Sequence, residues 1–365
     1  MIALVTDVHY RMTPALIRAL GRQGIAVYTC EKETETVLPG ARSKYVRKHF
    51  PLPAEGYKEA LLSLLKELDR PVLFPMGAAT LQMIAAEKET FAQVAQFCIG
   101  TPDSIDLLNS KKELHRLAET LEIPTPRAAA DCPCVVKPTC GEKFGLHAAE
   151  RYTICRTPAQ RDAAIAHFRA LAGEEPVVQE YLPGSGCGCS VIAKEGKVIA
   201  WIGHRRLREY PVSGGPSSCC VAIDDRCLLE WSQKLVAATN HSGPAMFEFK
   251  EDAEGNPRLL ECNPRIWGSF PLTDAARSTL SAAWYAAACG KELPENRFKA
   301  GKKMLFFPSD AMAALGYLKQ KKAGKFFAAV ADFLNPTVKD GLFRWSDPAP
   351  AFTYYAGLLR RGGKK

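Results

Sequence analysis

Residues 247–269, FEFKEDAEGNPRLLECNPRIWGS, contain two short alternating segments on either side of a turn. Glu248 lies between two phenylalanines, and Glu261 lies between a leucine and a cysteine. Because side chains alternate between the two faces of a strand, each glutamate is expected to point away from its apolar neighbours. The segment EDAEGNP (251–257) predicts a hairpin turn that pairs the two strands. Both glutamates are then expected on one sheet face, together with Asn263, which keeps the parity of Glu261.

Two carboxylates and an amide oxygen on one face indicate a bound cation, because the negative charges would otherwise repel each other. Hard oxygen ligands of this kind suit Mg²⁺, which prefers one or two carboxylates together with substrate phosphates. Arg265 has the same parity, and its guanidinium is suited to a carboxylate or a phosphate. The alternative is a solvated sheet face that carries two glutamates and no ligand. The joint pattern favours a metal–nucleotide site.

Three earlier segments add to this pattern. Lys111 lies in NSKKEL, and Lys137 ends the apolar run CVVK ahead of a loop that contains Gly141 and Gly145. The third segment is VVQEYLPG (177–184). Each is weak alone, because lysines at strand ends are usually solvated and glycines after strands usually form turns.

In this order and spacing, the four segments resemble the ATP-grasp superfamily, which includes biotin carboxylase, D-alanine ligase and the large subunit of carbamoyl phosphate synthetase. The resemblance covers roughly residues 1–290. It implies that Lys111 and Lys137 contact the nucleotide phosphates. It also implies that a hinge reads the adenine edge through its backbone, and this hinge consists of Gln179, Glu180, Tyr181 and Leu182.

The same resemblance implies that Glu248, Glu261 and Asn263 are the metal ligands and that Arg265 lies near the reacting carboxylate. The chain departs from the family at three places. Ser110 stands where many members have an acid, and Gln179 stands where biotin carboxylase-like members have a glutamate. The loop TCGEKFG lacks the serine-glycine core that often contacts phosphate.

The fold class expected from the sequence is α/β and α+β, with a pre-ATP-grasp parallel-sheet domain followed by an ATP-grasp fold. Near the N-terminus, apolar segments alternate with amphipathic ones, including predicted helices at 15–24, 57–70 and 79–94, which favours a parallel sheet. The first strand is followed by TDVHYRM, not by the G-x-G-x-x-G dinucleotide fingerprint. We predict three parts, which are a pre-ATP-grasp domain at 1–105, an ATP-grasp core at 106–292 and a basic extension at 293–365.

Two further segments lie between the hinge and the glutamate pair. In HRRLREYPVSGG (204–215), strand alternation puts His204 and Arg206 on one side, where they are predicted to help hold substrate. The alternative is two solvent-facing basic residues. The run GSGCGCS (184–190) is predicted to be a turn that enters the next strand. The 13 cysteines lack the repeated spacing of a zinc site and are expected to be reduced and mostly buried.

Composition limits the function classes. Charged residues make up 24% and hydrophobic residues 47%, as in ordinary globular proteins, and no apolar run is long enough to predict a membrane-spanning helix or a signal peptide. A cytoplasmic location is therefore expected. Of the net charge of +9, an excess of eight positive charges lies beyond residue 300, where twelve Lys and Arg stand against four Asp. No nucleic-acid partner is expected, and this basic tail is the only segment for which a weak contact with an anionic membrane is predicted.

These features predict an ATP- and Mg²⁺-dependent carboxylate–amine ligase that forms an acyl phosphate, with small-molecule substrates such as an amino acid or a small peptide. One alternative is a bicarbonate-activating enzyme that works through carboxyphosphate. Another is a non-catalytic ATP-binding protein that docks on an acidic surface. The sequence predicts no particular oligomeric state.

Overall fold

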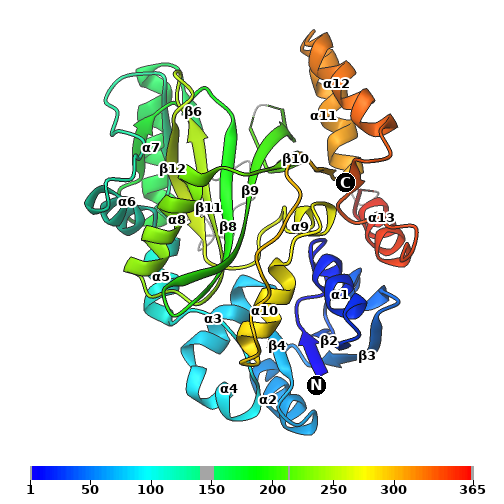
Figure 1. Ribbon diagram of the computed structural model, residues 1–365. Helices are drawn as coiled ribbons and strands as arrows, with labels where there is room; N and C mark the ends of the chain where they lie inside the picture. The colour runs from blue at the N-terminus through cyan, green and yellow to red at the C-terminus, as the bar shows by residue number, and fades with distance from the viewer. Residues whose placement is uncertain (1, 140–151, 213, 363–365) are drawn as a thin grey trace.

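The computed structural model describes residues 2–139, 152–212 and 214–362, so the loop that contains Gly141 and Gly145 lies outside the described residues. The N-terminal part contains a four-stranded sheet in the order β3-β2-β1-β4, and all its pairs are parallel. Its strands are β1 (Ile2–Val5), β2 (Ala26–Lys32), β3 (Val46–Leu52) and β4 (Val72–Phe74). The predicted parallel sheet is therefore confirmed (Figure 1).

Helices cover both faces of this small sheet. Alternate residues of β1 separate two cores, because Ala3 and Val5 pack with one set of helices and Leu4 with another. The helices are α1 (Thr13–Arg22), α2 (Tyr57–Glu67), α3 (Ala78–Ala86) and α4 (Lys88–Val94). The single helix predicted at 79–94 is wrong, because the backbone of Glu87 leaves the helical region between α3 and α4.

A seven-stranded sheet forms the centre of the molecule, in the order β12-β11-β8-β9-β10-β13-β14. Its strands are β8 (Gly186–Lys194), β9 (Lys197–Glu209), β10 (Ser217–Ile223), β11 (Gly243–Glu251), β12 (Pro257–Asn263), β13 (Lys303–Leu305) and β14 (Lys339–Asp340). The predicted hairpin is present as β11 and β12. The turn predicted at GSGCGCS is wrong from Gly186 onward, since that residue begins β8.

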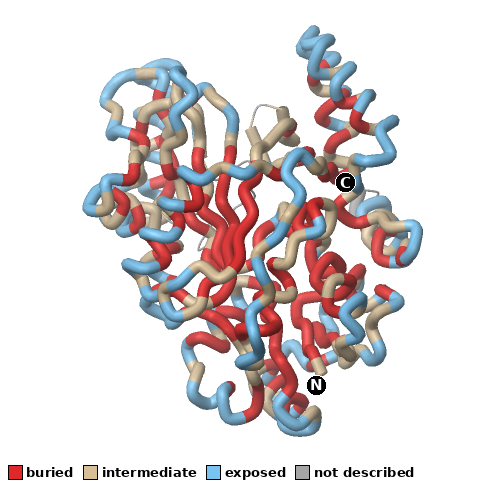
Figure 2. Tube along the Cα trace, in the orientation of Figure 1, coloured by how far each residue is buried: buried red, intermediate tan, exposed pale blue. Residues whose placement is uncertain are grey.

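The large sheet is covered differently on its two faces. One face packs on α5 (Pro102–Asn109), α6 (Lys111–Thr120) and α8 (Arg226–Ala238) through residues such as Val191 and Phe247. Part of the other face packs on α10 (Leu280–Ala288) and the N-terminal sheet through Ile192, Ile202 and Met246, next to the short α9 (Leu272–Ala275). The middle of the sheet is accordingly buried (Figure 2).

A third, three-stranded sheet has the order β6-β5-β7, with both pairs antiparallel. It consists of β5 (Cys134–Lys137), β6 (Thr153–Cys155) and β7 (Val177–Glu180), and α7 (Pro158–Ala172) packs on one of its faces. Together with the large mixed sheet, this confirms the predicted α+β character of the second part.

The C-terminal segment joins the large sheet. Strand β13 pairs antiparallel with β10, and β14 pairs parallel with β13, so the sheet continues beyond the predicted boundary at residue 292. Three helices complete it, which are α11 (Phe307–Lys319), α12 (Ala323–Leu334) and α13 (Ala349–Gly362). No helix in the described ranges is long and apolar enough to cross a membrane.

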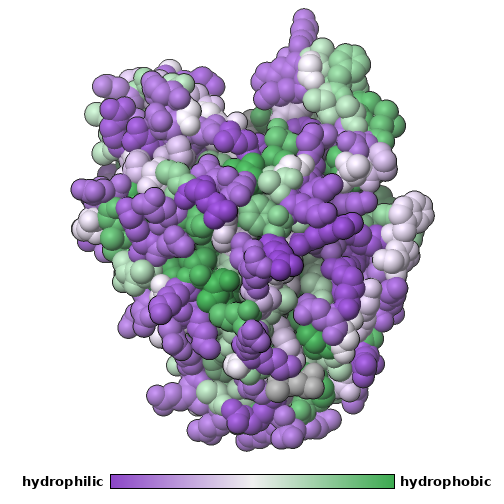
Figure 3. Space-filling view, in the orientation of Figure 1, coloured by the Kyte–Doolittle hydropathy of each residue, from purple (hydrophilic) through white to green (hydrophobic). Residues whose placement is uncertain are grey.

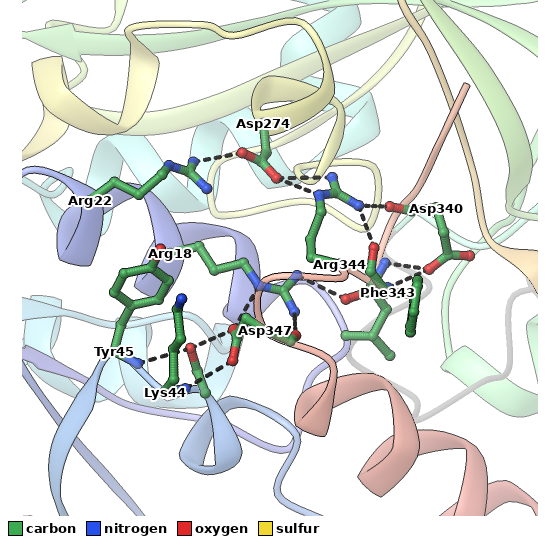
Figure 4. Close-up of polar contacts among 11 residues, drawn as sticks. Arg18, Arg22, Lys44, Tyr45, Asp274, Asp340, Phe343, Arg344 and Asp347 are labelled. Carbon is green, nitrogen blue, oxygen red and sulfur yellow. Dashed lines mark hydrogen bonds and ion pairs between the residues drawn. The ribbon is translucent and has the colours of Figure 1, made fainter. Parts of the chain in front are cut away.

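A buried ion pair holds the C-terminal segment to the N-terminal part (Figure 4). Arg18 of α1 is 1% exposed and donates through Nε to Asp347 Oδ2 at 2.8 Å. Its other nitrogens donate to the carbonyl oxygens of Leu342 and Asp347, both at 2.8 Å. Ser43 Oγ donates to the same carboxylate at 2.7 Å, so the charge of Asp347 is well satisfied away from water.

Two arginines of α1 therefore allow a matched test. Replacing Arg18 with Ala leaves Asp347 buried without its cation, and we expect the free energy of unfolding to fall by about 3–5 kcal/mol. The control is Arg22→Ala, because Arg22 is 46% exposed in its ion pair with Asp274. That change should cost about 0–1 kcal/mol. Urea denaturation measures the free energy of unfolding of both variants. Equal losses would contradict a stabilising role of the buried ion pair between Arg18 and Asp347.

Candidate active site

A row of paired residues crosses the large sheet where the N-terminal core no longer covers it. Glu261 of β12 pairs with Glu248 of β11, which pairs with Gly188 of β8 and through it with His204 of β9. Direct pairing places both carboxylates on the same face of adjacent strands, as the parity of the sequence requires. The row therefore consists of two carboxylates, a glycine without a side chain and an imidazole.

Glycines create the gap in this row. A Cβ on Gly188 would lie 2.5 Å from His204 Cε1 and 2.7 Å from the carbonyl oxygen of Phe247. A Cβ on Gly186 would lie 2.9 Å from Cδ of Arg206. The intervening Cys187 and Cys189 point to the opposite face and are buried there. The Gly-Cys-Gly-Cys alternation has the period of a strand, and this was the sequence signal that could have revealed the gap.

Each carboxylate of the pair has a cationic partner. Arg206 donates a hydrogen bond from Nη2 to Glu248 Oε2, and its Nη1 lies 3.4 Å from Glu209 Oε1. Lys111 Nζ lies 3.3 Å from Glu261 Oε2. Burial alone would lower the pKa of Arg206, but the surrounding carboxylates, chiefly Glu248, raise it above its usual value.

The two glutamates titrate differently as a result. Burial raises the pKa of Glu248, and the opposite Glu261 adds to this rise, although Arg206 counteracts it. Burial would also raise the pKa of Glu261, but Lys111 and Lys137 outweigh it and hold this pKa at about 2. Glu261 therefore stays ionised at neutral pH, and a cation is favoured beside it.

Lys137 approaches this pair from the three-stranded sheet. It ends β5, is 6% exposed, and has a pKa lowered to about 7 by burial and then by the nearby charge of Lys111. The register places Gln179 of β7 on the same face of that sheet as Lys137. Gln179 is buried, and its Oε1 has no hydrogen-bond partner among the described residues. An unpaired buried acceptor at this place fits an amino group of a ligand.

The remaining hinge residues are arranged around Gln179. The side chain of Glu180 accepts from Arg127 Nη2 at 2.8 Å, and the backbone N–H of Glu180 donates to the Arg127 carbonyl at 2.9 Å. Leu182 is buried, and Tyr181 is half-buried. No local sequence pattern identifies Arg127, because its partner Glu180 lies 53 positions away.

Arg265 and Asn263 lie together at the end of β12. Arg265 Nη2 donates to Asn263 Oδ1 at 3.0 Å, and Nη1 donates to the Ile266 carbonyl at 2.9 Å. This contact fixes the orientation of the Asn263 amide, so its oxygen points toward the guanidinium.

His204 is buried and carries no charge at neutral pH, because burial and then the charge of Arg206 lower its pKa to about 3. The alternative in which His204 and Arg206 face solvent is wrong, since the side chain of Arg206 is only 21% exposed. Of the two residues, Arg206 alone adds positive charge to the site.

The residues present fit a magnesium ion through the two facing carboxylates of Glu248 and Glu261. Among the described residues, no group of three or more His, Cys, Asp or Glu side chains could hold a metal ion. Cysteines that the structure describes are free thiols, and most are buried. Glu248 and Glu261 supply hard carboxylate oxygens of the kind that holds Mg²⁺ together with substrate phosphates, whereas Asn263 Oδ1 already accepts from Arg265 and would have to be shared with the ion.

One family model and several solved structures are similar to this chain. Residues 173–304 match the family described as "ATP-grasp in the biosynthetic pathway with Ter operon". None of the curated proteins compared with this chain matches its sequence.

Several solved structures are similar to the chain. One is the biotin carboxylase domain of 2-oxoglutarate carboxylase from Hydrogenobacter thermophilus, in complex with MgADP, ADP and bicarbonate. Its TM-score is 0.65, and it is 14% identical over 82% of this chain and 73% of that chain. Another is the ADP complex of N5-carboxyaminoimidazole ribonucleotide synthetase, with a TM-score of 0.63 and 13% identity over 88% and 84%. A third is the L-amino acid ligase from Bacillus licheniformis, with a TM-score of 0.55 and 16% identity over 80% and 74%.

These similarities show that the chain has an ATP-grasp fold, and they confirm the resemblance to the ATP-grasp superfamily that its sequence predicts. The low identities leave the substrate and the reaction to be inferred from the site itself.

The glycine gap can be tested by adding single methyl groups. Gly188→Ala should destabilise the fold or displace His204, because the new Cβ meets the rigid backbone oxygen of Phe247. Gly186→Ala meets only a flexible arginine side chain, so this variant should fold normally. The expected loss for Gly188→Ala is about 1–3 kcal/mol, typical of overpacking. Gly324→Ala, with nothing near its Cβ, is the control, and thermal denaturation of all three proteins measures the difference.

Proposed function

We propose that this chain is an ATP- and Mg²⁺-dependent carboxylate–amine ligase of the ADP-forming type, acting through an acyl phosphate on an amino acid or a small peptide-like substrate. The observation that carries the proposal is the facing pair of Glu248 and Glu261, surrounded by Lys111, Lys137 and Arg206. Two acids and three cations converge on a sheet floor opened by glycine. A solvated sheet face that binds no ligand would not require three basic side chains around two carboxylates.

Different residues of the chain are proposed to bind the phosphates and the base of ATP. Lys111 and Lys137 provide positive charge for the phosphates, and residues 179–182 line the place for the base, where Gln179 offers an unpaired acceptor. Mg²⁺, when bound, shields the charge of the β- and γ-phosphates and orients the transferred group. Glu248 would hold the ion only after leaving Arg206, and Glu209 would keep the guanidinium in place because it already pairs with Arg206.

Arg265 is proposed to act on the acyl group. A substrate carboxylate oxygen attacks the γ-phosphorus and ADP leaves, which gives an acyl phosphate. The amine then attacks the acyl carbon, and phosphate leaves. A guanidinium at the acyl oxygen stabilises the negative charge that develops there, and Asn263 orients it through their hydrogen bond.

Bicarbonate activation is the second candidate. Two of the similar structures are a biotin carboxylase domain and a carboxyaminoimidazole ribonucleotide synthetase, and the first is a complex with bicarbonate. The L-amino acid ligase has the same fold, which supports the first candidate equally well. A non-catalytic ATP-binding protein is the third, and it would bind nucleotide without releasing phosphate.

One experiment separates the three candidates. Phosphate release from ATP is measured over amino acids and small peptides in bicarbonate-depleted buffer, with hydroxylamine present to trap acyl phosphates as hydroxamates. A ligase gives substrate-dependent phosphate and a hydroxamate. Turnover only after bicarbonate is restored would favour carboxyphosphate chemistry, and nucleotide binding without turnover would favour the binding protein.

The metal role of Glu261 can be tested by binding. Wild type should gain about 2.7 kcal/mol of stability from ATP at about 100 times its Kd, and only with Mg²⁺ present. Glu261→Gln keeps the shape but removes one charge, so it should lose most of this metal dependence and all turnover. Glu254→Gln makes the same change at the exposed turn of the same hairpin and serves as the control. Thermal shift assays with and without Mg²⁺ measure the effect, and wild-type behaviour of Glu261→Gln would refute the metal site.

The lowered pKa of Lys137 predicts that ATP binding takes up a proton. This pKa is lowered to about 7, first by burial and then by Lys111, so much of the lysine is neutral near pH 8. Bound phosphates favour the charged form and raise this pKa, so ATP binding near pH 8 should take up close to one proton. Below about pH 6 the lysine is already charged, and the uptake should vanish. Calorimetry in buffers of different ionisation enthalpy measures the uptake, which Lys137→Met should abolish.

A further inference from the structure

Helices α11 and α12 form a hairpin that projects from the edge of the large sheet (Figure 1). The inner side of α11 is buried through Asp310, Ala313, Ala314 and Tyr317, and that of α12 through Ala329 and Asp332. Their outer sides carry six exposed apolar residues, which are Phe307, Met312, Leu315, Leu318, Phe327 and Leu334. We call these six residues the hairpin face.

The hairpin face is an unusual surface for a helix pair. Phe327 is 66% exposed and Leu334 is 79% exposed. On a space-filling view, an apolar patch covers the hairpin beneath its polar tip (Figure 3). Exposed apolar residues gathered at one place mark interaction sites, whereas scattered ones need no explanation.

Every charge on the outside of this hairpin is positive. The two acids of the helices, Asp310 and Asp332, are buried at its base. The turn between the helices and the helix ends beside it carry four exposed lysines, which are Lys319, Lys321, Lys322 and Lys325. None of them pairs with a carboxylate in the ranges that the structure describes. Lys325 lies over the ring of Tyr317 at 5.3 Å.

The base of the hairpin is fixed by Arg208 of β9. Its guanidinium donates to Asp310 Oδ2 and to Asp332 Oδ2, each at 2.8 Å. Ser218 also donates to Asp310, and Lys303 to Asp332, both at 2.7 Å. Because this buried network sets the direction of both helices, the hairpin face cannot turn inward to cover itself.

We propose that the hairpin face and its four lysines dock on an anionic membrane surface. The apolar side chains enter the boundary between headgroups and acyl chains, and the lysines contact the anionic headgroups. A second copy of this chain is the less favoured occupant, because the outer surface of its hairpin offers only lysines and no acid to pair with them. The proposal does not depend on the ligase reaction.

The charge requirement is tested by flotation of the full chain with vesicles. Wild type should bind vesicles of phosphatidylcholine and phosphatidylglycerol far better than vesicles of phosphatidylcholine alone, and added salt should weaken the binding. Replacing the four lysines with Gln should reduce the affinity at least about 100-fold, since each lysine contributes several-fold. The control removes the same charge at four exposed lysines elsewhere, which are Lys48, Lys66, Lys197 and Lys299.

The apolar requirement has a closely matched control. Phe327→Ser with Leu334→Ser should release the chain from anionic vesicles. Phe352→Ser with Leu359→Ser changes the same residue types on α13, where their exposed fractions are 65% and 79%, and should bind like wild type. All four positions are exposed, so the variants should keep the wild-type melting temperature.

Three outcomes would overturn the proposal. The first is equal binding to neutral and anionic vesicles, and the second is equal loss in the paired variants and their controls. The third is a wild-type protein that binds no vesicle and sediments as a dimer, together with a Phe327→Ser, Leu334→Ser variant that sediments as a monomer. This result would assign the hairpin face to a second copy of the chain.

Discussion

The facing carboxylates of Glu248 and Glu261 are the constraint around which the part of the chain after the N-terminal sheet is organised. Like charges directly opposite each other on adjacent strands destabilise a sheet, and burial increases the cost. The chain compensates with cations from three different elements, which are Lys111 at the start of α6, Lys137 at the end of β5 and Arg206 on β9. A hydrophobic or neutral pair would need none of these partners. The arrangement makes physical sense as a site that exchanges protein cations for a metal ion and a polyphosphate.

Strand period explains how the sheet can serve both as a core and as a site. Along β8, Cys187, Cys189 and Val191 pack on the helices of one face, whereas Gly186 and Gly188 leave the other face open. His204 and Arg206 occupy the space above these glycines. Side chains of ordinary size would fill the floor and keep Arg206 away from Glu248. The segment 186–189 therefore stabilises the fold with Cys187 and Cys189 and makes room for His204 and Arg206 at Gly186 and Gly188.

The sequence predicted the features that depend on local pattern. Parity around the EDAEGNP turn placed Glu248, Glu261 and Asn263 correctly on one face, because neighbouring strands joined by a tight turn have few possible registers. It failed where a partner is distant or where a pattern has two meanings. The glycine-rich run predicts a turn, because glycine is common in turns and rare within strands, yet Gly186 begins a strand. The bond between Arg18 and Asp347 spans 329 positions, and no local pattern carries that information.

Strand β9 connects the candidate active site to the C-terminal helices through two arginines two positions apart. Arg208 is 5% exposed and is satisfied by two buried aspartates, so moving this strand would break several charge-assisted bonds at once. Arg206 has fewer partners and greater exposure, and both of its carboxylates lie on the side of the candidate site. The guanidinium of Arg206 can therefore leave Glu248 by rotating its own side chain while β9 stays in place. In the proposed reaction, the rigidity at Arg208 would let Arg206 exchange its carboxylate partner without moving the strand.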